Sequence, residues 1–293
     1  MKTNVHRSLA RKNTVVDDSI TVIGAGPSGL ASAIVLARAG RKVIVFEREK
    51  TVGARFHSDF QGLENWSAKK NVLDELRDFG MPVEFIDNAV CKGIALDWSG
   101  RTYAVSDHEP LFYLVRRGPG EDTLDHGLLQ AARDAGAEVR FGESVDHAPP
   151  NSIIASGPRR ADVIASGYNF RTSMDDGALV CFDDRLAPWG YAYLLVTQGR
   201  GTLAVCLFRD FKRHQVCLKA AAAFFTDHAG LDMSEPKPFG GYGMVSRISR
   251  AERRNGLLVG ERAGLQDALA GFGLRYAMIS GALAARSLLS GGA

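Results

Sequence analysis

A glycine-rich turn between a short strand and a helix constrains this chain more than any other feature. The segment SITVIG at 19–24 predicts a buried strand, and the turn GAGPSG at 24–29 follows it directly. The apolar helix LASAIVLARAG and the strand KVIVF at 42–46 come next, and Glu47 stands at the end of that strand. A strand, a GxGxxG turn, a helix and a strand that ends in an acid together predict a βαβ unit that binds a dinucleotide.

Each residue type in this turn has a physical role. Gly24 permits the tight turn, Gly26 lets the backbone approach a pyrophosphate, and Gly29 lets the helix lie close to the strand. Pro27 suits the first helical turn, where its missing N–H costs nothing. The helix N-terminus, with Ser28 in its first turn, then presents free N–H groups and a partial positive charge to the phosphates.

Glu47 lies where an acid accepts hydrogen bonds from the hydroxyls of an adenosine ribose, about 20 residues beyond the glycines. An acid there disfavours a 2′-phosphate, so the nucleotide is predicted to be FAD or NAD rather than NADP. An NAD dehydrogenase would usually continue with further short βα units before its catalytic domain. This chain instead continues with a helix and a strand at 123–145, a short strand within 151–158 and a long strand-rich stretch. That order favours FAD.

A second glycine-rich turn lies near the other end of the chain. The strand GLLVG at 256–260 runs into the loop ERAGLQDALAGFG, and an apolar helix begins at about Gly273. Two such strand-to-helix turns at opposite ends of the sequence suit an extended ligand. The first would bind the AMP half and the pyrophosphate, and the second would bind the flavin half.

Three segments give the chain a resemblance to known enzymes: VIGAGPSGLASAIVLARAGRKVIVFERE, RRGPGEDTLDHGLLQAARDAGAEV and LLVGERAGLQDALAGFGLRYAMISGALAA. From about Ser19 to Leu289 it resembles the FAD enzymes of the p-hydroxybenzoate hydroxylase type, and within them the geranylgeranyl reductase group. The resemblance implies an α/β fold, with a Rossmann-like FAD-binding domain of three layers (ββα) and an inserted antiparallel-sheet substrate domain. The implied boundaries are a tail at 1–18, a discontinuous FAD-binding domain at 19–75, 112–168 and 246–293, and a substrate domain at 76–111 and 169–245.

The resemblance also assigns the second glycine-rich turn. Gly260 and Glu261 would lie at the ribitol and the pyrophosphate, although the family usually has Asp where this chain has Glu261. Gly271, Gly273 and the helix start at Leu274 would lie against the isoalloxazine. At Gly273 a side chain would occupy the space of the cofactor, and glycine is also expected there for its backbone freedom.

The resemblance also implies further FAD contacts. They are Arg48 over the adenine, Gly53 and Arg55 in a flavin-facing loop, Arg116 or Arg117 at the phosphates, Val145 at the adenine, and Gly157 after its strand. For each arginine, an exposed surface position is an equally open interpretation.

Residues 169–245 are predicted to form an antiparallel sheet across the flavin, because ALVCF, YAYLLVT and TLAVCLF are strand-like runs separated by turn residues. KAAAAFFTDHAG predicts a helix, and FGGYGMVSRI at 239–248 is expected to be a turn that leads back to the nucleotide domain.

The segment PWGYAYLLV at 188–196 resembles the family's Tyr-x-Trp-x-Phe-Pro substrate motif. Tyr191 is kept, while Tyr193, Leu195 and Val196 replace Trp, Phe and Pro. Tyr191 and Tyr193 are therefore candidate walls of a substrate pocket, and a plain sheet core is the equal alternative.

No catalytic residue is predicted. His57 is a loop histidine with no partner visible in the sequence, and such residues are more often structural or exposed. Flavin hydroxylases of this fold usually have Asp-Gly after the corresponding strand, where this chain has Ser156-Gly157. There is no second GxGxxG, so electrons would come from transiently bound NAD(P)H or from a small redox protein.

Composition excludes some classes of function. The net charge of +3 is too small to favour nucleic acid, and no apolar run is long enough to span a bilayer. The basic start MKTNVHRSLARK is interpreted as a solvated tail, with a membrane-surface arm or a targeting segment as the alternatives, so peripheral membrane contact stays open. The cysteines have no CxxC or zinc-ligand spacing, so no metal is predicted and a reducing, cytoplasmic location is expected. They are expected to be small buried residues: Cys91, Cys181, Cys206 and Cys217.

The sequence thus predicts an FAD-dependent oxidoreductase, with reduction of a carbon–carbon double bond in a small apolar substrate, such as an isoprenoid, as the favoured reaction. A flavin monooxygenase or halogenase-like enzyme is the enzymatic alternative. A flavin-binding electron carrier without an organic substrate is the alternative of another class. It would need an exposed flavin edge rather than an apolar pocket.

Overall fold

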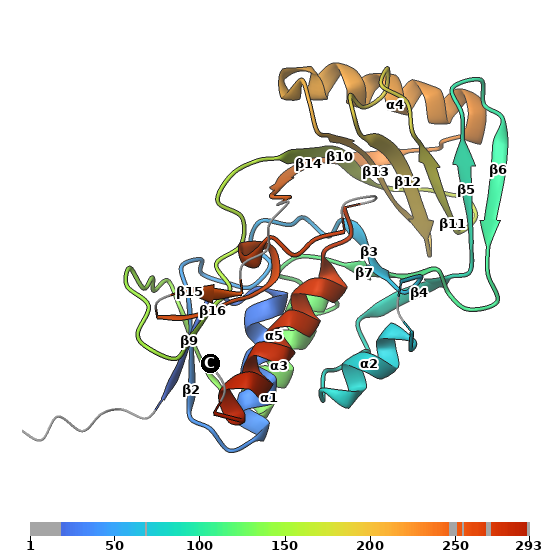
Figure 1. The fold of residues 1–293 in the computed structure, drawn as a ribbon. Helices are drawn as coiled ribbons and strands as arrows, with labels where there is room; N and C mark the ends of the chain where they lie inside the picture. The colour runs from blue at the N-terminus through green and yellow to red at the C-terminus, as the bar shows by residue number, and fades with distance from the viewer. Residues whose placement is uncertain (1–18, 68, 246–250, 254, 268–270, 292–293) are drawn as a thin grey trace, which may run out of the picture.

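The computed structural model describes residues 19–67, 69–245, 251–253, 255–267 and 271–291. The predicted tail at 1–18 lies outside the described residues. The elements form two halves, which lie one above the other in Figure 1. We call them the nucleotide half and the sheet half.

The nucleotide half is built on a six-stranded sheet in the order β15-β16-β9-β1-β2-β8. All neighbours are parallel except β15 and β16. The strands are β1 (Ile20–Ile23), β2 (Val43–Glu47), β8 (Glu138–Phe141), β9 (Ser152–Ile154), β15 (Glu252–Arg253) and β16 (Gly256–Leu258). Strand β16 therefore lies in the same sheet as β1, although more than half of the sequence separates them.

Three helices pack together on this sheet (Figure 1): α1 (Pro27–Arg38), α3 (Leu124–Asp134) and α5 (Leu274–Leu289). Val22, Val45 and Ile153 of the strands are fully buried in the core that these helices cover. Helix α5 lies close against α1, because a Cβ on Gly281 would come within 2.0 Å of the backbone oxygen of Ser28. Glycine at 281 thus allows the last helix of the chain to pack onto the first.

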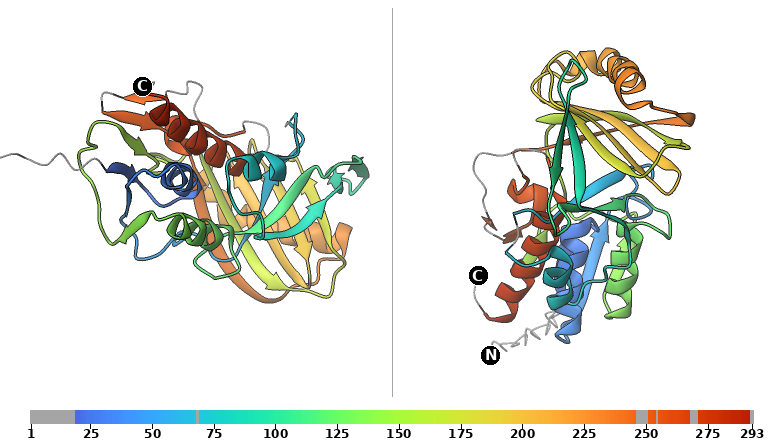
Figure 2. Two further views of the ribbon diagram at one scale, coloured as in Figure 1. Left: turned by 90° about the horizontal axis from the view of Figure 1, so that it is seen from below. Right: turned by 90° about the vertical axis from the view of Figure 1, so that its right-hand side faces the viewer.

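The sheet half contains a seven-stranded sheet in the order β14-β10-β13-β12-β11-β5-β6, in which only β11 and β5 are parallel. Helix α4 (His214–Ala229) covers one face, as Figure 2 shows. The strands are β5 (Lys92–Leu96), β6 (Thr102–Ser106), β10 (Val163–Arg171), β11 (Gly177–Cys181), β12 (Tyr191–Thr197), β13 (Arg200–Leu207) and β14 (Ser234–Gly243), and the short 3-10 helix η1 (Phe211–Arg213) precedes α4.

Alternation along β12 decides which side chains face which half. Ala192, Leu194 and Val196 are buried beneath α4. Tyr191, Tyr193 and Leu195 are on the opposite face, toward the nucleotide half. The candidate substrate residues thus lie on the face that α4 does not cover.

A three-stranded sheet joins the two halves. It consists of β3 (Phe60–Glu64), β7 (Phe112–Arg116) and β4 (Ile86–Val90), with α2 (Val72–Asp78) between β3 and β4 in sequence. Phe60 packs in one apolar cluster with Leu195 of the seven-stranded sheet. The backbone N–H of Phe60 also donates to Thr202 Oγ1 at 3.0 Å. Apolar packing and a buried hydrogen bond therefore fix the sheet half above the nucleotide half.

The predicted fold class is confirmed: an α/β protein with a Rossmann-like parallel sheet and an antiparallel-sheet domain. Some local predictions differ from the structure. Strand β10 begins at Val163, so residues 163–168, which the sequence grouped with the nucleotide domain, belong to the seven-stranded sheet. Residues 76–111 supply β4 to the joining sheet and β5 and β6 to the seven-stranded sheet.

The turn expected at 239–248 is wrong for its first half, because residues 239–243 complete β14. Phe239 pairs with Gly167 across the sheet, and a Cβ on Gly167 would lie 2.5 Å from the Phe239 ring. The Phe239 ring lies over Gly167, and this contact stabilises β14. The glycines within β14 would not by themselves predict a strand. Residues 246–248 lie outside the described residues. Cys91 is exposed, contrary to the expectation for all four cysteines, while Cys181 and Cys217 are buried.

Candidate cofactor and substrate site

The N-terminal glycine turn brings three backbone segments into close contact. Gly24 has a φ of +104°, and a Cβ there would lie 2.5 Å from the backbone oxygen of Ala155. A Cβ on Gly29 would lie 1.9 Å from the backbone oxygen of Gly24. A Cβ on Gly26, by contrast, would have no atom of the described residues within 4 Å. Gly24 and Gly29 are thus required by packing, whereas Gly26 leaves open space in front of the turn.

The helices that follow the two glycine-rich turns begin without a side-chain cap. Helix α1 has Gly26 at its N-cap and Pro27 and buried Ser28 in its first turn, and α5 has Gly273 at its N-cap. Neither helix has an acid in its first turn. Asn71 and Thr123 do cap α2 and α3 with their side chains. Uncapped N–H groups at the start of α1 and α5 suit an anionic ligand.

Glu47 is fixed at the end of β2 beside the first turn. Its Oε2 accepts a hydrogen bond from the N–H of Ala25 at 2.7 Å, and its Oε1 accepts one from the N–H of Glu49 at 3.0 Å. The carboxylate thus occupies a defined place at the edge of the glycine turn. It retains lone pairs for a ribose hydroxyl, because a carboxylate has about four acceptor positions.

The two glycine-rich turns are in direct contact. A Cβ on Gly260 would lie 2.8 Å from Ser28 Oγ, and Gly260 has a φ of +58°. The N–H of Gly260 donates to Ser280 Oγ of α5 at 2.9 Å. The turn after β16 and the turn after β1 therefore form one continuous backbone surface, as an extended dinucleotide requires.

Glu261 is bonded within the protein. Its Oε1 accepts from the N–H of Met244 at 2.7 Å, and Arg55 Nη2 donates to its Oε2 at 3.4 Å. Burial raises the pKa of the Glu261 carboxyl above its ordinary value of 4.5, and the Arg55 guanidinium opposes this rise. The longer acid therefore also links the nucleotide half to the end of β14, and its predicted ribitol contact stays a prediction.

The loop before α5 departs from one expectation. Gly273 has a φ of −115° and a ψ of −12°, which other residues adopt readily, so the expected need for backbone freedom at Gly273 is wrong. Gly271 has a φ of +69°, and a Cβ there would lie 3.3 Å from the Tyr191 hydroxyl. The steric constraint therefore lies at Gly271. Leu274 begins α5 and is buried in the core.

The same loop contains a side chain that sequence reasoning missed. Gln266 Nε2 donates to the backbone oxygen of Gly271 at 2.9 Å. Its Oε1 is buried and has no hydrogen-bond partner among the described residues. An orphaned acceptor beside the start of α5 is consistent with a ligand N–H at this place. No spacing rule in the sequence distinguishes Gln266 from other loop residues.

The predicted arginines lie in different environments. Arg48 is exposed and pairs with Glu49 at 3.2 Å. Arg116 Nε pairs with Asp87 at 2.9 Å. Arg117 is buried, and its Nε and Nη2 both donate to the Asp125 carboxylate at 2.8 Å. These partners explain each position without a phosphate.

The remaining predicted cofactor positions surround the glycine turns. Gly53 has a φ of +62°, and a Cβ there would lie 2.5 Å from the backbone of Gly118. Gly157 has a φ of +71° and open space around it. Val145 is half-buried in a loop that returns to β2, where the N–H of Glu143 donates to the backbone oxygen of Glu47 at 3.0 Å. Val145 thus lies near the adenosine end of the predicted site.

Tyr191 and Tyr193 form an aromatic row with Phe182 on the uncovered face of the sheet. Ring centroids are 5.7 Å apart between Phe182 and Tyr191, and 6.0 Å apart between Tyr191 and Tyr193. Burial raises the pKa of both tyrosine hydroxyls well above their usual range, and a hydrogen bond with Cys206 raises that of Tyr191 further. The hydroxyls are therefore neutral groups in an apolar setting.

His57 contributes its backbone rather than its ring to known contacts. Its N–H donates to Asp59 Oδ1 at 2.9 Å, and its backbone oxygen accepts from Asn169 Nδ2 at 2.9 Å. The side chain is exposed, which is one of the two alternatives expected for a loop histidine. Within the described residues, no three His, Cys, Asp or Glu side chains gather as a metal site. None of the helices in the described ranges is long and apolar enough to cross a membrane.

These features fit FAD. Among the described residues, open space lies in front of Gly26, two helix N-termini without side-chain caps flank the joined turns, Glu47 lies at the adenosine end, and the buried Oε1 of Gln266 has no partner at the other end.

Comparisons with known proteins agree with this geometry. A model of the NAD(P)-binding Rossmann-like domain family matches residues 22–66. The menaquinone reductase of Mycolicibacterium smegmatis is 28% identical over 257 residues, which is 82% of this chain and 54% of that protein. The chain thus spans about half the length of this curated relative.

Solved structures of flavoproteins share the fold. A geranylgeranyl bacteriochlorophyll reductase-like protein from Thermoplasma acidophilum matches with a TM-score of 0.73 and 18% identity, over 93% of this chain and 79% of that one. The p-nitrophenol 4-monooxygenase of Pseudomonas putida matches with a TM-score of 0.66 and 14% identity, over 94% of this chain and 82% of that one. The chain therefore has the fold and the nucleotide-binding turn of FAD-dependent oxidoreductases, and it is similar in structure to a geranylgeranyl reductase-like protein.

Proposed function

We propose that this chain is an FAD-dependent oxidoreductase that reduces a carbon–carbon double bond in a small apolar substrate of the isoprenoid class. The substrate would lie between the seven-stranded sheet and the flavin. The relative named as a menaquinone reductase and the geranylgeranyl reductase-like neighbour support a reductase and this class of substrate.

The observation that carries the proposal is the position of Tyr191. Its ring lies on the sheet face that α4 leaves uncovered, and its hydroxyl lies beside Gly271, in the loop that leads into the uncapped start of α5. An aromatic wall that meets the flavin end of the cofactor site suits an apolar substrate.

Bound FAD would supply the hydride-transfer chemistry. Gly24, Gly26 and the first turn of α1 would bind the pyrophosphate, and Glu47 would orient the adenosine. The N–H groups at the start of α5 would stabilise negative charge on the flavin. Tyr191 and Tyr193 would exclude water from the reacting carbons.

The test begins with the purified full chain. Heat-denatured protein should release FAD, identified by chromatography. After anaerobic reduction, the flavin should be reoxidised by geranylgeranyl diphosphate or by a short-chain menaquinone, and the product should gain two hydrogens by mass spectrometry. The saturated analogue is the matched control and should leave the flavin reduced. A flavin that neither isoprenoid reoxidises would contradict the proposed substrate class.

A monooxygenase is the second candidate, because the p-nitrophenol 4-monooxygenase has the same fold. Reoxidation in air separates the two. Fast reoxidation with an oxygenated or halogenated product supports the monooxygenase or halogenase-like activity, whereas slow reoxidation supports the reductase. An electron carrier would exchange electrons with a redox protein and leave both isoprenoids unchanged.

The electron donor is proposed to be NAD(P)H that binds transiently, or a small redox protein. Anaerobic mixing of the oxidised holoprotein with NADH, NADPH or a reduced ferredoxin distinguishes these donors. The one that bleaches the flavin absorbance fastest at equal concentration identifies the class.

A further inference from the structure

Aromatic side chains gather in solvent at one end of the seven-stranded sheet, where β11 and β13 finish and β12 begins. Phe182 is 56% exposed and Trp189 is 64% exposed. Phe208 lies beside them, since a Cβ on Gly190 would be 3.4 Å from its ring. Exposed aromatic residues that gather at one place mark an interaction surface.

The backbone holds Trp189 in this exposed position at a cost. Its φ is +59°, a left-handed conformation that bulky residues rarely adopt. Its N–H donates to Asp184 Oδ1 at 2.8 Å, and the guanidinium carbon of Arg209 lies 3.8 Å from the ring centroid. Strain of this kind persists where the surrounding structure enforces it and is often functional.

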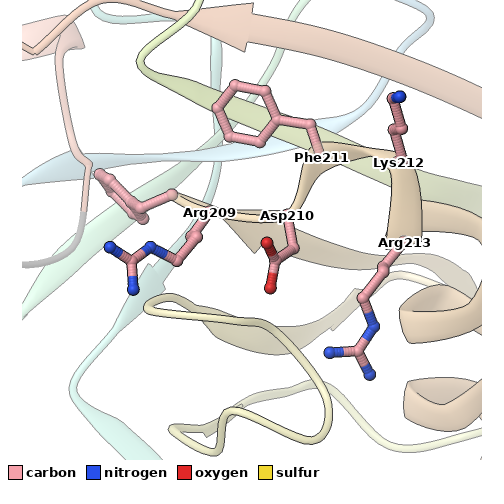
Figure 3. Close-up of a pocket in the computed structure, with 6 residues that line it drawn as sticks. Arg209, Asp210, Phe211, Lys212 and Arg213 are labelled. Atoms are coloured by element: carbon pink, nitrogen blue, oxygen red, sulfur yellow. The ribbon is translucent and has the colours of Figure 1, made fainter.

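Cations surround the aromatic residues. Arg209, Lys212 and Arg213 lie within five residues of one another and line a surface hollow of about 570 Å³ together with Phe208, Asp210 and Phe211 (Figure 3). Lys212 and Arg213 are exposed.

The acids at this end of the sheet offset only part of that charge. Asp183 is bonded to Arg185 by two hydrogen bonds of 2.7 Å. Asp184 accepts from the Trp189 backbone N–H, and Asp210 is the residue that precedes η1. Asp97 and Arg101 lie at the same end, on the loop between β5 and β6, and offset each other. Five cations and four acids therefore leave one excess positive charge around the aromatic rings.

The exposed aromatic residues continue into the candidate substrate site. Phe182 contacts Tyr191, and Tyr191 contacts Tyr193, with centroid distances of 5.7 and 6.0 Å. Tyr191 in turn lies beside Gly271 of the flavin loop. One aromatic row thus leads from the solvent to the place where an apolar substrate is proposed to react.

We propose that this end of the sheet, the aromatic end (Phe182, Trp189, Phe208, Arg209, Lys212 and Arg213), docks on an anionic phospholipid surface. Tryptophan and arginine are residues of the membrane–water interface, where the ring enters the acyl boundary and the cation meets lipid phosphates. Docking here would open the row Phe182–Tyr191 to the lipid phase. Only the use of that row by a substrate rests on the proposed function.

The first test measures binding of the FAD-loaded protein to vesicles by flotation. Vesicles of equimolar phosphatidylcholine and phosphatidylglycerol should bind the protein at low salt, and pure phosphatidylcholine should bind it far more weakly. The triple variant Arg209→Gln, Lys212→Gln, Arg213→Gln should weaken binding by roughly fivefold for each cation removed. The triple change Arg41→Gln, Lys92→Gln, Arg133→Gln alters equal charge elsewhere and should leave more binding than the first variant.

The second test follows the aromatic residues. Phe182→Ser with Trp189→Asn should abolish most vesicle binding, and asparagine tolerates the left-handed backbone of position 189, so the fold should persist. Leu283→Ser, a change at a 53% exposed apolar residue of α5, is the control. Phosphatidylcholine lipids with brominated acyl chains, mixed with phosphatidylglycerol, should quench tryptophan emission of the wild type more than that of Trp189→Phe.

Three results would overturn the proposal. Binding that is equal for the wild type and both aromatic-end variants would show that these residues do not touch lipid. Binding lost only when Lys2, Arg7, Arg11 and Lys12 are changed to Gln would assign the contact to the N-terminal segment. If the wild type does not bind anionic vesicles, a protein partner would be the explanation for the exposed residues of the aromatic end. Vesicle binding without isoprenoid reduction would retain the docking surface and reject the proposed function.

Discussion

Gly26 and Gly29 are three residues apart, yet an added methyl group meets open space at one and backbone at the other. Gly29→Ala should lower the free energy of unfolding of the apoprotein by about 1–3 kcal/mol, the usual cost of overpacking. Gly26→Ala should leave that stability nearly unchanged and still weaken FAD binding, because its methyl group would enter the ligand's space. Urea unfolding and FAD titration of both variants measure the contrast. Normal FAD affinity in a folded Gly26→Ala protein would place the pyrophosphate elsewhere.

Glu47 is expected to contribute directly to nucleotide affinity. Glu47→Ala should weaken FAD binding by about 1–3 kcal/mol, the range for charged hydrogen bonds. Its carboxylate also accepts from Ala25 and Glu49, so part of the loss reflects a looser turn. Glu49→Ala is the matched control, because that exposed side chain pairs only with Arg48 among the interactions known for it. Equal affinities for the two variants would argue against a ribose at Glu47.

At the scale of elements, the start of α5 is the most direct test of where the flavin lies. Gly273→Val introduces no backbone strain, and the described atoms nearest to its Cβ belong to Gln266, the first at an ordinary distance of 3.6 Å. The apoprotein should therefore fold normally. If the helix start faces the flavin, the added side chain enters the cofactor's space, and FAD affinity should fall at least about tenfold.

Glu261→Ala provides the comparison for that prediction. Its carboxylate already bonds Met244 and Arg55, so its removal should weaken FAD binding less than Gly273→Val does. Residual ADP affinity should survive in Gly273→Val, because the N-terminal turn is untouched. Titration of both apoproteins gives the order, and the opposite order would reject the assignment of this loop to the flavin.

The elements that the sequence predicted well depend on local patterns. The βαβ unit at 20–47 is specified by neighbouring residues, because strand, turn and helix signals lie within one short segment. Which strands pair with one another could not be predicted from local patterns. The pairing of β14 with β10 depends on Phe239 over Gly167, and the parallel pair of β11 and β5 joins segments far apart in sequence. Propensity contains no information on such contacts.

The candidate site residues also divide into those specified by local sequence and those specified by contacts with distant segments. The glycines at 24, 26 and 29 were predictable because their spacing has a mechanism. The environment of Arg117 was not, because Arg117 follows strand β7 while the Asp125 carboxylate that binds it lies on helix α3. Gln266 gave no sequence signal at all, since its significance is a buried oxygen without a partner in the described part of the chain.

For the whole molecule, a buried polar link holds the two halves in register. Thr202 Oγ1 accepts from the Phe60 N–H at 3.0 Å and donates to Asn169 Oδ1 at 2.8 Å. Thr202→Val keeps the shape and leaves both partners unsatisfied, so the free energy of unfolding should fall by about 1–3 kcal/mol. Thr226→Val, which removes an exposed hydroxyl of α4, is the control and should cost far less. Equal urea midpoints for the two variants would show that the link does not stabilise the assembly.

The contact of Gly281 with Ser28 has a consequence for how the chain is made. Helix α1 leaves the ribosome long before α5, the helix that covers it, has been synthesised. The apolar side of α1 must therefore wait, exposed or held by a chaperone, until α5 has emerged. A nascent chain arrested just before residue 274 should consequently be protease-sensitive throughout its nucleotide half, while a chain extended far enough to free α5 from the ribosome should become resistant.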